Sequence, residues 1–178
     1  MTAGATGNVL RVERRFLLPS LPRPVTQGRV ALIEEHYLRG TGMTLRRTMS
    51  AGRAAELTLG QQVRSASDRT ARVTLTERLT PQAYGELAKL PADVLVWRRY
   101  DAELSGWPCA VHVFEGELHG LVLAQATFPS RTEAWRFPRP VYAVAEVTGD
   151  DRLAEPALAR TSEAQLARLV AEYGMLLR

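Results

Sequence analysis

Arginine recurs on segments of alternating polar and apolar residues, the pattern of a β-strand with two different faces. The arginines in step with this alternation are Arg11, Arg15, Arg46, Arg72 and Arg99. A guanidinium group presents a planar fork of donors that matches phosphate oxygens, so a shared face of arginines could bind a phosphorylated anion. The alternation alone leaves a second interpretation open, in which the arginines meet water while Val12 and Phe16 fill a conventional core.

The overall charge favours anionic partners without identifying one. The 178 residues include 23 Lys plus Arg against 19 Asp plus Glu, a net charge of +4. Lys89 is the only lysine, so nearly all of the positive charge is arginine. High-GC codon usage would produce the same excess, and the bias is therefore not a binding signal by itself.

Length and composition predict one globular domain. We expect residues 9–178 to share a single core and residues 1–8 to form a flexible tail. Hydrophobic residues make up 46% of the chain, and no apolar run reaches the ~18 residues that a membrane helix needs. The first residues lack a secretory signal pattern, and the single cysteine, Cys109, excludes an intramolecular disulfide. We therefore expect a cytoplasmic protein with no membrane partner.

Nine segments have the alternation and length of strands. They cover residues 9–18, 29–39, 43–49, 54–63, 71–79, 93–104, 109–118, 121–128 and 141–148. Short turn sequences between many of them favour antiparallel neighbours. Because an antiparallel sheet of this size tends to curl or close and so lose its edges, we expect a β-rich α+β fold built around an antiparallel barrel.

Two helices interrupt the strand pattern. Residues 79–91 contain Thr80 as a candidate cap, and residues 161–177 contain Ser162 and Gln165 at the spacing of a capping box. Both have apolar residues at helical spacing, so we expect them to flank the barrel.

Common catalytic and nucleotide-binding motifs are missing from the sequence. There is no P-loop and no Gly-x-Ser-x-Gly elbow. The three histidines do not stand at the i, i+4 spacing of helical zinc ligands. The three tryptophans are not part of a basic and aromatic motif, so the sequence predicts no specific nucleic-acid partner.

Four blocks, in their order along the chain, resemble the CYTH domain of the triphosphate tunnel metalloenzyme family. They read VERRFLL (12–18), HYLRG (36–40), VFEGELHGLVLAQATF (113–128) and AEVTGDDRLAEPALA (145–159). The resemblance implies an eight-stranded antiparallel barrel that is open as a tunnel. In that family the polar interior holds a triphosphate-bearing ligand and two Mg²⁺ or Mn²⁺ ions, and members include inorganic and thiamine triphosphatases, adenylyl cyclases and RNA triphosphatases.

Carried over by position, the resemblance implies that the five arginines named above are the phosphate ligands. It leaves Glu13 and Glu146 as candidate metal ligands. The other acidic positions of the family pattern are occupied by Arg11, Thr74, Thr76, His112, Gln125 and Thr127. Two carboxylates are too few for two ions, so we expect metal-dependent catalysis to be weakened or lost, with Mg²⁺ or Mn²⁺ a candidate cofactor that has few ligands. A bound polyanion, or pairing of arginine with glutamate, would relieve the excess positive charge in the lumen.

Three functions follow from these residues. The first is binding of a phosphorylated small molecule or polyphosphate by the arginines. The second is a metal-dependent triphosphatase, rather than an adenylyl cyclase, with His112 as the candidate catalytic base because imidazole titrates near pH 6.5. The third is a scaffold whose partner binds outside the barrel.

Overall fold

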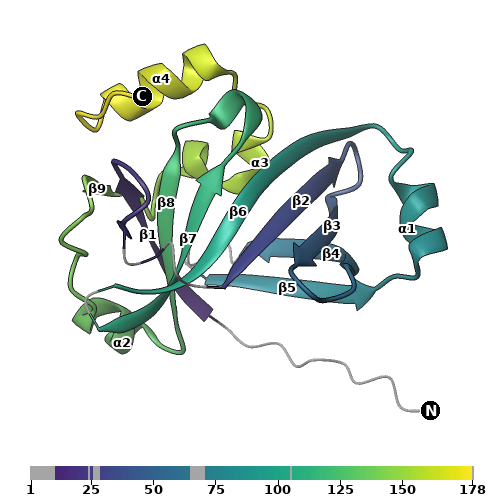
Figure 1. The fold of residues 1–178 in the computed structure, drawn as a ribbon, viewed down its shortest axis with the longest axis horizontal. Coiled ribbons are helices and arrows are strands. Elements are labelled where there is room, and N and C mark those ends of the chain that lie inside the picture. The colour runs from purple at the N-terminus through teal and green to yellow at the C-terminus, as the bar shows by residue number, and fades with distance from the viewer. Residues whose placement is uncertain (1–10, 24, 26–28, 65–70, 105, 178) are drawn as a thin grey trace.

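The computed structural model describes residues 11–23, 25, 29–64, 71–104 and 106–177, and its main element is one antiparallel sheet (Figure 1). Nine strands form this sheet, and every strand segment expected from the sequence overlaps one of them. They are β1 (Arg11–Leu18), β2 (Val30–Leu38), β3 (Met43–Ser50), β4 (Glu56–Arg64), β5 (Ala71–Arg78), β6 (Ala92–Leu104), β7 (Trp107–Phe114), β8 (Val122–Phe128) and β9 (Ala145–Glu146). The tail predicted over residues 1–8 lies outside the described residues.

The order of strands in the sheet is β5-β4-β3-β2-β6-β7-β8-β1-β9. Strand β1 also pairs with β5, at Arg11↔Arg72 and Val12↔Ala71. The sheet therefore curves so strongly that strands at opposite ends of this order meet (Figure 1). The β-rich antiparallel fold is therefore confirmed. The contact between β1 and β5 covers only these two residue pairs, and the fully closed barrel remains a prediction.

Four short α-helices accompany the sheet in the part of the chain that the structure describes: α1 (Pro81–Leu87), α2 (Arg131–Arg136), α3 (Glu155–Leu158) and α4 (Glu163–Ala171). Both helices predicted from the sequence are present. The Thr80 side chain accepts a hydrogen bond from the Ala83 backbone N–H at the start of α1, and Ser162 and Gln165 form a capping box at the start of α4. Helices α2 and α3 were not predicted, because six-residue and four-residue segments are too short to show helical periodicity.

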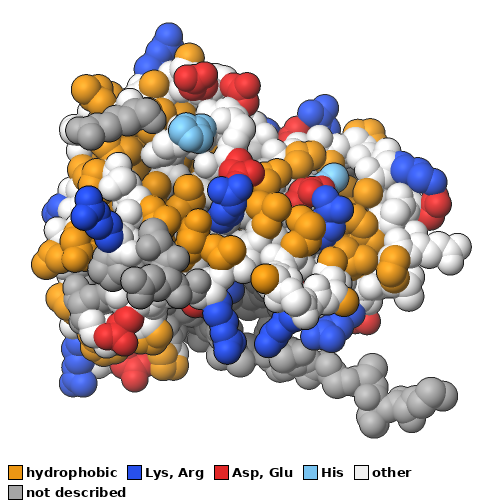
Figure 2. Space-filling view, viewed as in Figure 1, with side chains coloured by type: hydrophobic (Ala, Val, Ile, Leu, Met, Phe, Trp, Pro, Cys, Tyr) orange, Lys and Arg blue, Asp and Glu red, His pale blue; other side chains and the backbone are white. Residues whose placement is uncertain are grey.

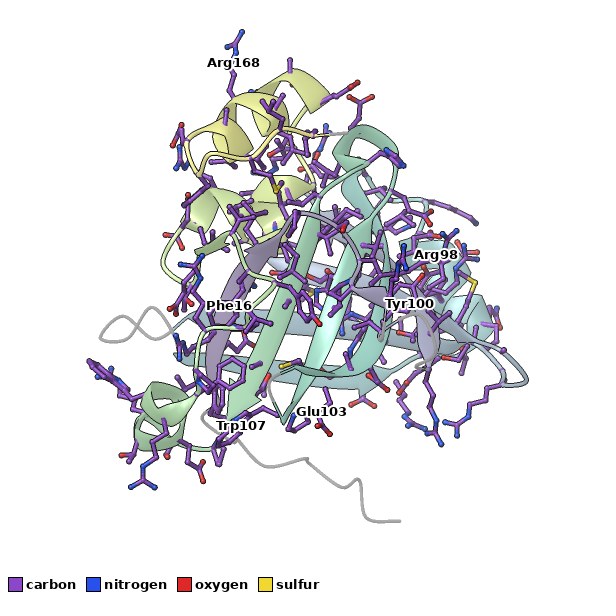
Figure 3. The ribbon with its side chains drawn as sticks, turned by 60° about the vertical axis from the view of Figure 1, so that its left-hand side comes forward. Phe16, Arg98, Tyr100, Glu103, Trp107 and Arg168 are labelled. Atoms are coloured by element: carbon purple, nitrogen blue, oxygen red, sulfur yellow. The ribbon has the colours of Figure 1, made fainter. Side chains whose placement is uncertain are left out.

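The two faces of β1 pack into different clusters, because alternate residues of a strand point to opposite sides. On the outer face, Phe16 packs with Phe128 and Phe137 beneath α2. Figure 3 shows Phe16 and Trp107 on the side of the sheet where α2 lies. On the inner face, Leu17 belongs to a second cluster, which joins the sheet to the C-terminal helices.

The C-terminal segment covers one end of the curved sheet (Figure 1). Leu153, Leu158 and Leu166 are at most 1% exposed and pack with Leu17 and Phe114 from the inner faces of β1 and β7. The space on the inner side of the sheet is thus bounded at this end by apolar side chains from α3 and α4.

None of the helices that the structure describes is long and apolar enough to cross a membrane.

Candidate functional site

A cavity of about 600 Å³ lies on the inner side of the sheet. Its lining residues come from each of β1 to β8 and from α3. Much of the lining follows strand alternation: Glu35 and Tyr37 of β2, for example, face the cavity with Ile33. The volume lies within the range of small-molecule binding sites, about 300 to 1,000 Å³.

The structure brings several of the residues singled out from the sequence into this cavity. Glu13, Arg46, Arg99 and His112 all line it, together with Thr76, Gln125 and Thr127, which stand at acidic positions of the family pattern. Arg15 lies beside it and contacts a lining residue. Arg11 and Arg72 face each other in the register of β1 and β5, but their side chains lie outside the described residues.

Arg15 is 4% exposed and bound by the C-terminal segment. Its Nη2 donates to the two carboxylate oxygens of Glu155 at 2.6 and 2.9 Å, and its Nη1 donates to the Leu153 carbonyl at 3.0 Å. Burial opposes the charge of this guanidinium, but the carboxylates of Glu155 and Glu13 outweigh burial and raise the Arg15 pKa. Helix α3 therefore supplies the counter-charge for a buried arginine on β1.

Arg46 is held by the buried carboxylate of Glu35. Glu35, 3% exposed, accepts hydrogen bonds from the Arg46 guanidinium and from the Tyr37 hydroxyl. Burial opposes the charge of Arg46, yet Glu35 outweighs it and raises the Arg46 pKa, while burial and the same carboxylate raise the Tyr37 pKa above its usual range. This arginine is thus paired within the protein, although its side chain is 48% exposed.

Arg99 is the most loosely held of the cavity arginines whose side chains the structure describes. Its side chain is 49% exposed, and its Nη2 lies 3.3 Å from Oδ1 of Asp101, which is 61% exposed. Exposed ion pairs of this kind contribute little, about 0 to 1 kcal/mol, because water solvates both partners. An anion that enters the cavity could therefore replace Asp101 at small cost.

His112 lies against aromatic rings on the cavity wall. It is 7% exposed, and its ring centroid is 5.9 Å from that of Trp97 and 6.4 Å from that of Phe114. Burial, with a smaller effect from nearby Arg99, lowers the His112 pKa to about 4, so the imidazole is neutral at neutral pH. A base with this pKa is poorly matched to proton transfer near pH 7.

The burial of His112 predicts that stability decreases in mild acid. An unfolded imidazole binds its proton below pH 6.5, whereas the folded pKa is about 4, so the unfolded state binds more protons between these values. The free energy of unfolding should therefore fall by roughly 3 kcal/mol as the pH decreases through this window. Thermal unfolding measured at pH 7.0 and at pH 4.5 checks this prediction. The melting temperature should fall less between these two pH values in His112→Gln than in the wild type.

The exposed His119 provides the control for this measurement. In His119→Gln the melting temperature should fall between pH 7.0 and pH 4.5 by as much as in the wild type. If the melting temperature depended on pH equally in His112→Gln and in the wild type, the assignment of His112 as a neutral, buried imidazole would be wrong.

Glu146, the second candidate metal ligand, lies away from the cavity. The register Phe16↔Glu146 between β1 and β9 puts it on the outer face of β1. There its Oε2 lies 2.7 Å from Arg14 Nη2, and its Oε1 accepts from the Thr148 hydroxyl at 2.7 Å. The hydrogen bond from Arg14 lowers the Glu146 pKa. The structure therefore does not bring Glu13 and Glu146 together.

The carboxylates around the cavity do not fit a two-metal centre. Among the described residues, no group of three or more His, Cys, Asp or Glu side chains has an arrangement that could hold a metal ion. Glu35 and Glu155, which are buried or nearly so, are engaged by Arg46 and Arg15. Arginine thus occupies the carboxylate oxygens that hard divalent cations would require.

Sequence reasoning missed Glu35, Asp101 and Glu155 as cavity residues. The first two could have been found, because strand alternation puts Glu35 with Ile33 and Asp101 with Arg99. Glu155 follows β9 in a segment without periodicity, and no local signal indicates that α3 reaches the cavity.

Comparisons with known proteins identify the fold. No family model and no curated protein matches the chain. Among solved structures, the inorganic triphosphatase NE1496 has 24% sequence identity and a TM-score of 0.58, with 85% of this chain and 95% of that chain covered. PH1012 from Pyrococcus horikoshii OT3 has 13% identity and a TM-score of 0.45, with 69% and 82% covered.

The similarity to NE1496 spans most of both chains. The chain therefore shares the CYTH-type fold of NE1496, which confirms the resemblance seen in its sequence.

Proposed function

We propose that the protein binds a phosphorylated anion, such as a triphosphate, a polyphosphate or a nucleotide, in the cavity through arginine side chains. The observation that carries this proposal is the position of Arg99, a half-exposed guanidinium on the cavity wall whose partner Asp101 is itself exposed. A phosphate oxygen accepts a charge-assisted hydrogen bond from guanidinium in the geometry that a carboxylate would use. The fold supports the proposal, because its structural neighbour NE1496 is an inorganic triphosphatase.

The other arginines divide into two groups. Arg15 and Arg46 are bound by Glu155 and Glu35, so a ligand would compete with these carboxylates for them. Arg11 and Arg72 stay predicted ligands, opposite each other in the register. On the face seen in Figure 2, Lys and Arg side chains gather along the lower edge of the molecule, where they would attract an anion over a distance of several ångströms.

Two-metal phosphohydrolysis is not part of the proposed function. The reason is the pairing described above, in which arginines engage Glu35 and Glu155. Phosphate binding by guanidinium groups needs no divalent cation, so it should persist in a chelator.

Calorimetry with tripolyphosphate in EDTA tests the proposal. We expect saturable binding by the wild type, weakened about tenfold to a hundredfold in Arg99→Ala, the range that loss of a hydrogen bond to a charged group produces. Arg98→Ala is the matched control, because Arg98 follows Trp97 on the opposite face of β6 and pairs with Glu115 at 2.9 Å. Failure of the wild type to bind tripolyphosphate in the millimolar range would overturn the proposal.

A phosphate-release assay separates binding from catalysis. We expect no turnover of tripolyphosphate or ATP with Mg²⁺ or Mn²⁺ above the rate without protein. Turnover that Glu13→Gln abolishes would instead establish a metal-dependent triphosphatase, with the cavity carboxylate Glu13 among its functional residues.

A further inference from the structure

Exposed apolar side chains gather in helix α2 and in the segment that follows it. Trp135 is 85% exposed, Val141 is 84% exposed and Tyr142 is 49% exposed. None of the three lines the cavity. Figure 1 shows α2 and the chain that leads from it to β9 along one side of the molecule. Large apolar side chains that meet water add little to the core, so several of them on one surface indicate a contact site.

Buried anchors fix α2 to the sheet. Ala134 and Phe137 are 3% and 2% exposed and belong to the outer cluster with Phe16. At the end of the helix, Arg14 Nη1 donates to the carbonyl oxygens of Ala134 and Phe137, at 2.8 and 2.6 Å. Trp135 therefore projects from a rigid support, and little conformational entropy would be lost when it contacts a partner.

A tight turn presents the other two apolar side chains. The Ala143 N–H donates to the Pro140 carbonyl at 2.9 Å, so Val141 and Tyr142 occupy the two central positions of the turn. Arg139 braces this turn by donating to the Ala143 carbonyl at 2.6 Å. Turns usually carry Gly, Asn, Asp, Ser or Pro, whose backbone or hydrogen-bonding properties suit the turn geometry. Two exposed apolar residues there are not explained by the turn itself.

The same surface is positively charged. Residues 131–142 contain three exposed arginines, Arg131, Arg136 and Arg139. Glu133 is the only acidic residue in this range, so three positive charges stand against one negative charge, a net charge of +2. The next acidic residue along the chain, Glu146, is paired with Arg14. A partner of this surface should therefore carry negative charge beside apolar groups.

We propose that this surface binds a membrane surface rich in anionic phospholipids. The α2 patch, as we name it, consists of Arg131, Trp135, Arg136, Arg139, Val141 and Tyr142. Arginines pair with lipid phosphates, while Trp, Tyr and apolar side chains enter the boundary between headgroups and acyl chains. A lipid surface fits the high exposure of Trp135 and Val141 better than a folded protein, because fluid lipids surround a projecting side chain whereas a rigid partner needs a matching pocket.

Contact of this kind holds the protein against the membrane without crossing it. It departs from the expectation of no membrane partner, which was based on the lack of a long apolar run in the sequence. Binding at the interface needs only an apolar surface beside basic residues. The proposal is also independent of anion binding in the cavity, because no residue of the α2 patch lines the cavity.

Quenching of tryptophan fluorescence by brominated lipids tests the position of Trp135. The full chain is mixed with vesicles of brominated phosphatidylcholine and phosphatidylglycerol in equal parts, and bromine quenches a tryptophan only at close range. The other two tryptophans are shielded, because Trp97 is 2% exposed and Trp107 packs against the outer cluster. We expect these vesicles to quench the fluorescence of the wild type, and we expect Trp135→Phe to lose this quenching.

Sedimentation with unbrominated vesicles of the same charge measures affinity. Trp135→Ala should weaken binding about tenfold, because an apolar side chain no longer enters the lipid. Arg136→Glu should weaken it by at least about tenfold, because it reverses a charge at the membrane surface. Leu176→Ala and Arg168→Glu are the matched controls and should each weaken binding less than about threefold. Leu176 is 82% exposed, and Arg168 projects from α4 at the other end of the molecule from α2 (Figure 3).

Three outcomes would overturn the proposal. The first is failure of the wild type to sediment with anionic vesicles, which would favour an acidic protein as the partner of the α2 patch. The second is an equal loss of binding in Arg136→Glu and Arg168→Glu, which would show that only the net charge of the protein acts. The third is a loss of vesicle binding in Arg99→Ala, because a lipid phosphate would then bind in the cavity and not at the α2 patch.

Discussion

Glu155→Ala should destabilise the protein by about 3–5 kcal/mol, because it removes the main counter-charge of an arginine that is almost completely buried. Arg15 is 4% exposed, and both oxygens of Glu155 accept hydrogen bonds from its Nη2. Without Glu155 the guanidinium keeps the Leu153 carbonyl as an acceptor but loses its ion pair. Urea denaturation followed by circular dichroism at neutral pH gives the change in the free energy of unfolding.

A matched control lies on helix α1, where Glu86 pairs with Lys89 and both side chains are 69% exposed. Glu86→Ala should change the free energy of unfolding by less than about 0.5 kcal/mol. The double variant Arg15→Met with Glu155→Ala should be more stable than Glu155→Ala alone, because no buried charge is then left unpaired. A loss in Glu155→Ala no larger than in Glu86→Ala would show that this pair is not a buried ion pair in solution.

Phe16→Ala should cost a similar amount, about 3–5 kcal/mol, through the cavity that it leaves in the outer core. Phe16 is 0% exposed, its ring centroid lies 5.7 Å from that of Phe137, and the Arg14 guanidinium carbon lies 5.1 Å from the centroid of its ring. The substitution removes aromatic packing on the side of the sheet that α2 covers. For a domain of this size, the melting temperature should fall by roughly 6–20 °C.

Trp135→Ala is the comparison for this prediction, since Trp135 is 85% exposed. Removal of an aromatic side chain that already contacts water should change stability by less than about 0.5 kcal/mol. Equal melting temperatures for the two variants would mean that the outer face of β1 is not a packed core.

Strand alternation sorted residues onto two faces because it acts within a few residues, while the family resemblance indicated which face lines the interior. Once a segment is recognised as a strand, the period of two separates Glu13 and Arg15 from Arg14 and Phe16. Arg14 indeed meets Phe16 and Phe137 on the outer face, while Glu13 lines the cavity. The same rule, with the opposed pair Glu35↔Arg46 in the hairpin, makes Glu35 a natural partner for an inward arginine.

Strand alternation could not predict contacts that depend on parts of the chain far apart in the sequence. The side on which Glu146 lies depends on the register of a two-residue strand, β9, against β1. The partner of Arg15 depends on where the chain turns after β9 to form α3. Of the four carboxylates that line the cavity, the sequence singled out only Glu13, because Glu155 arrives from the C-terminal segment and Glu35 and Asp101 were not assigned.

The position of β1 in the sheet has a consequence for biosynthesis. This strand is made before the other eight strands of the sheet, yet its main partner is β8, through pairs such as Arg15↔Gln125. The Arg15 side chain binds Glu155, which follows 140 residues later. Until β7 and β8 have been synthesised, the apolar face with Phe16 and Leu18 lacks most of its packing partners and is exposed to water. Closing so long a loop costs chain entropy before any contact compensates for it, so β1 should join the sheet late and slowly. A nascent chain arrested before β8 would then be a substrate for chaperones, and pairing of β1 with β8 would end that dependence.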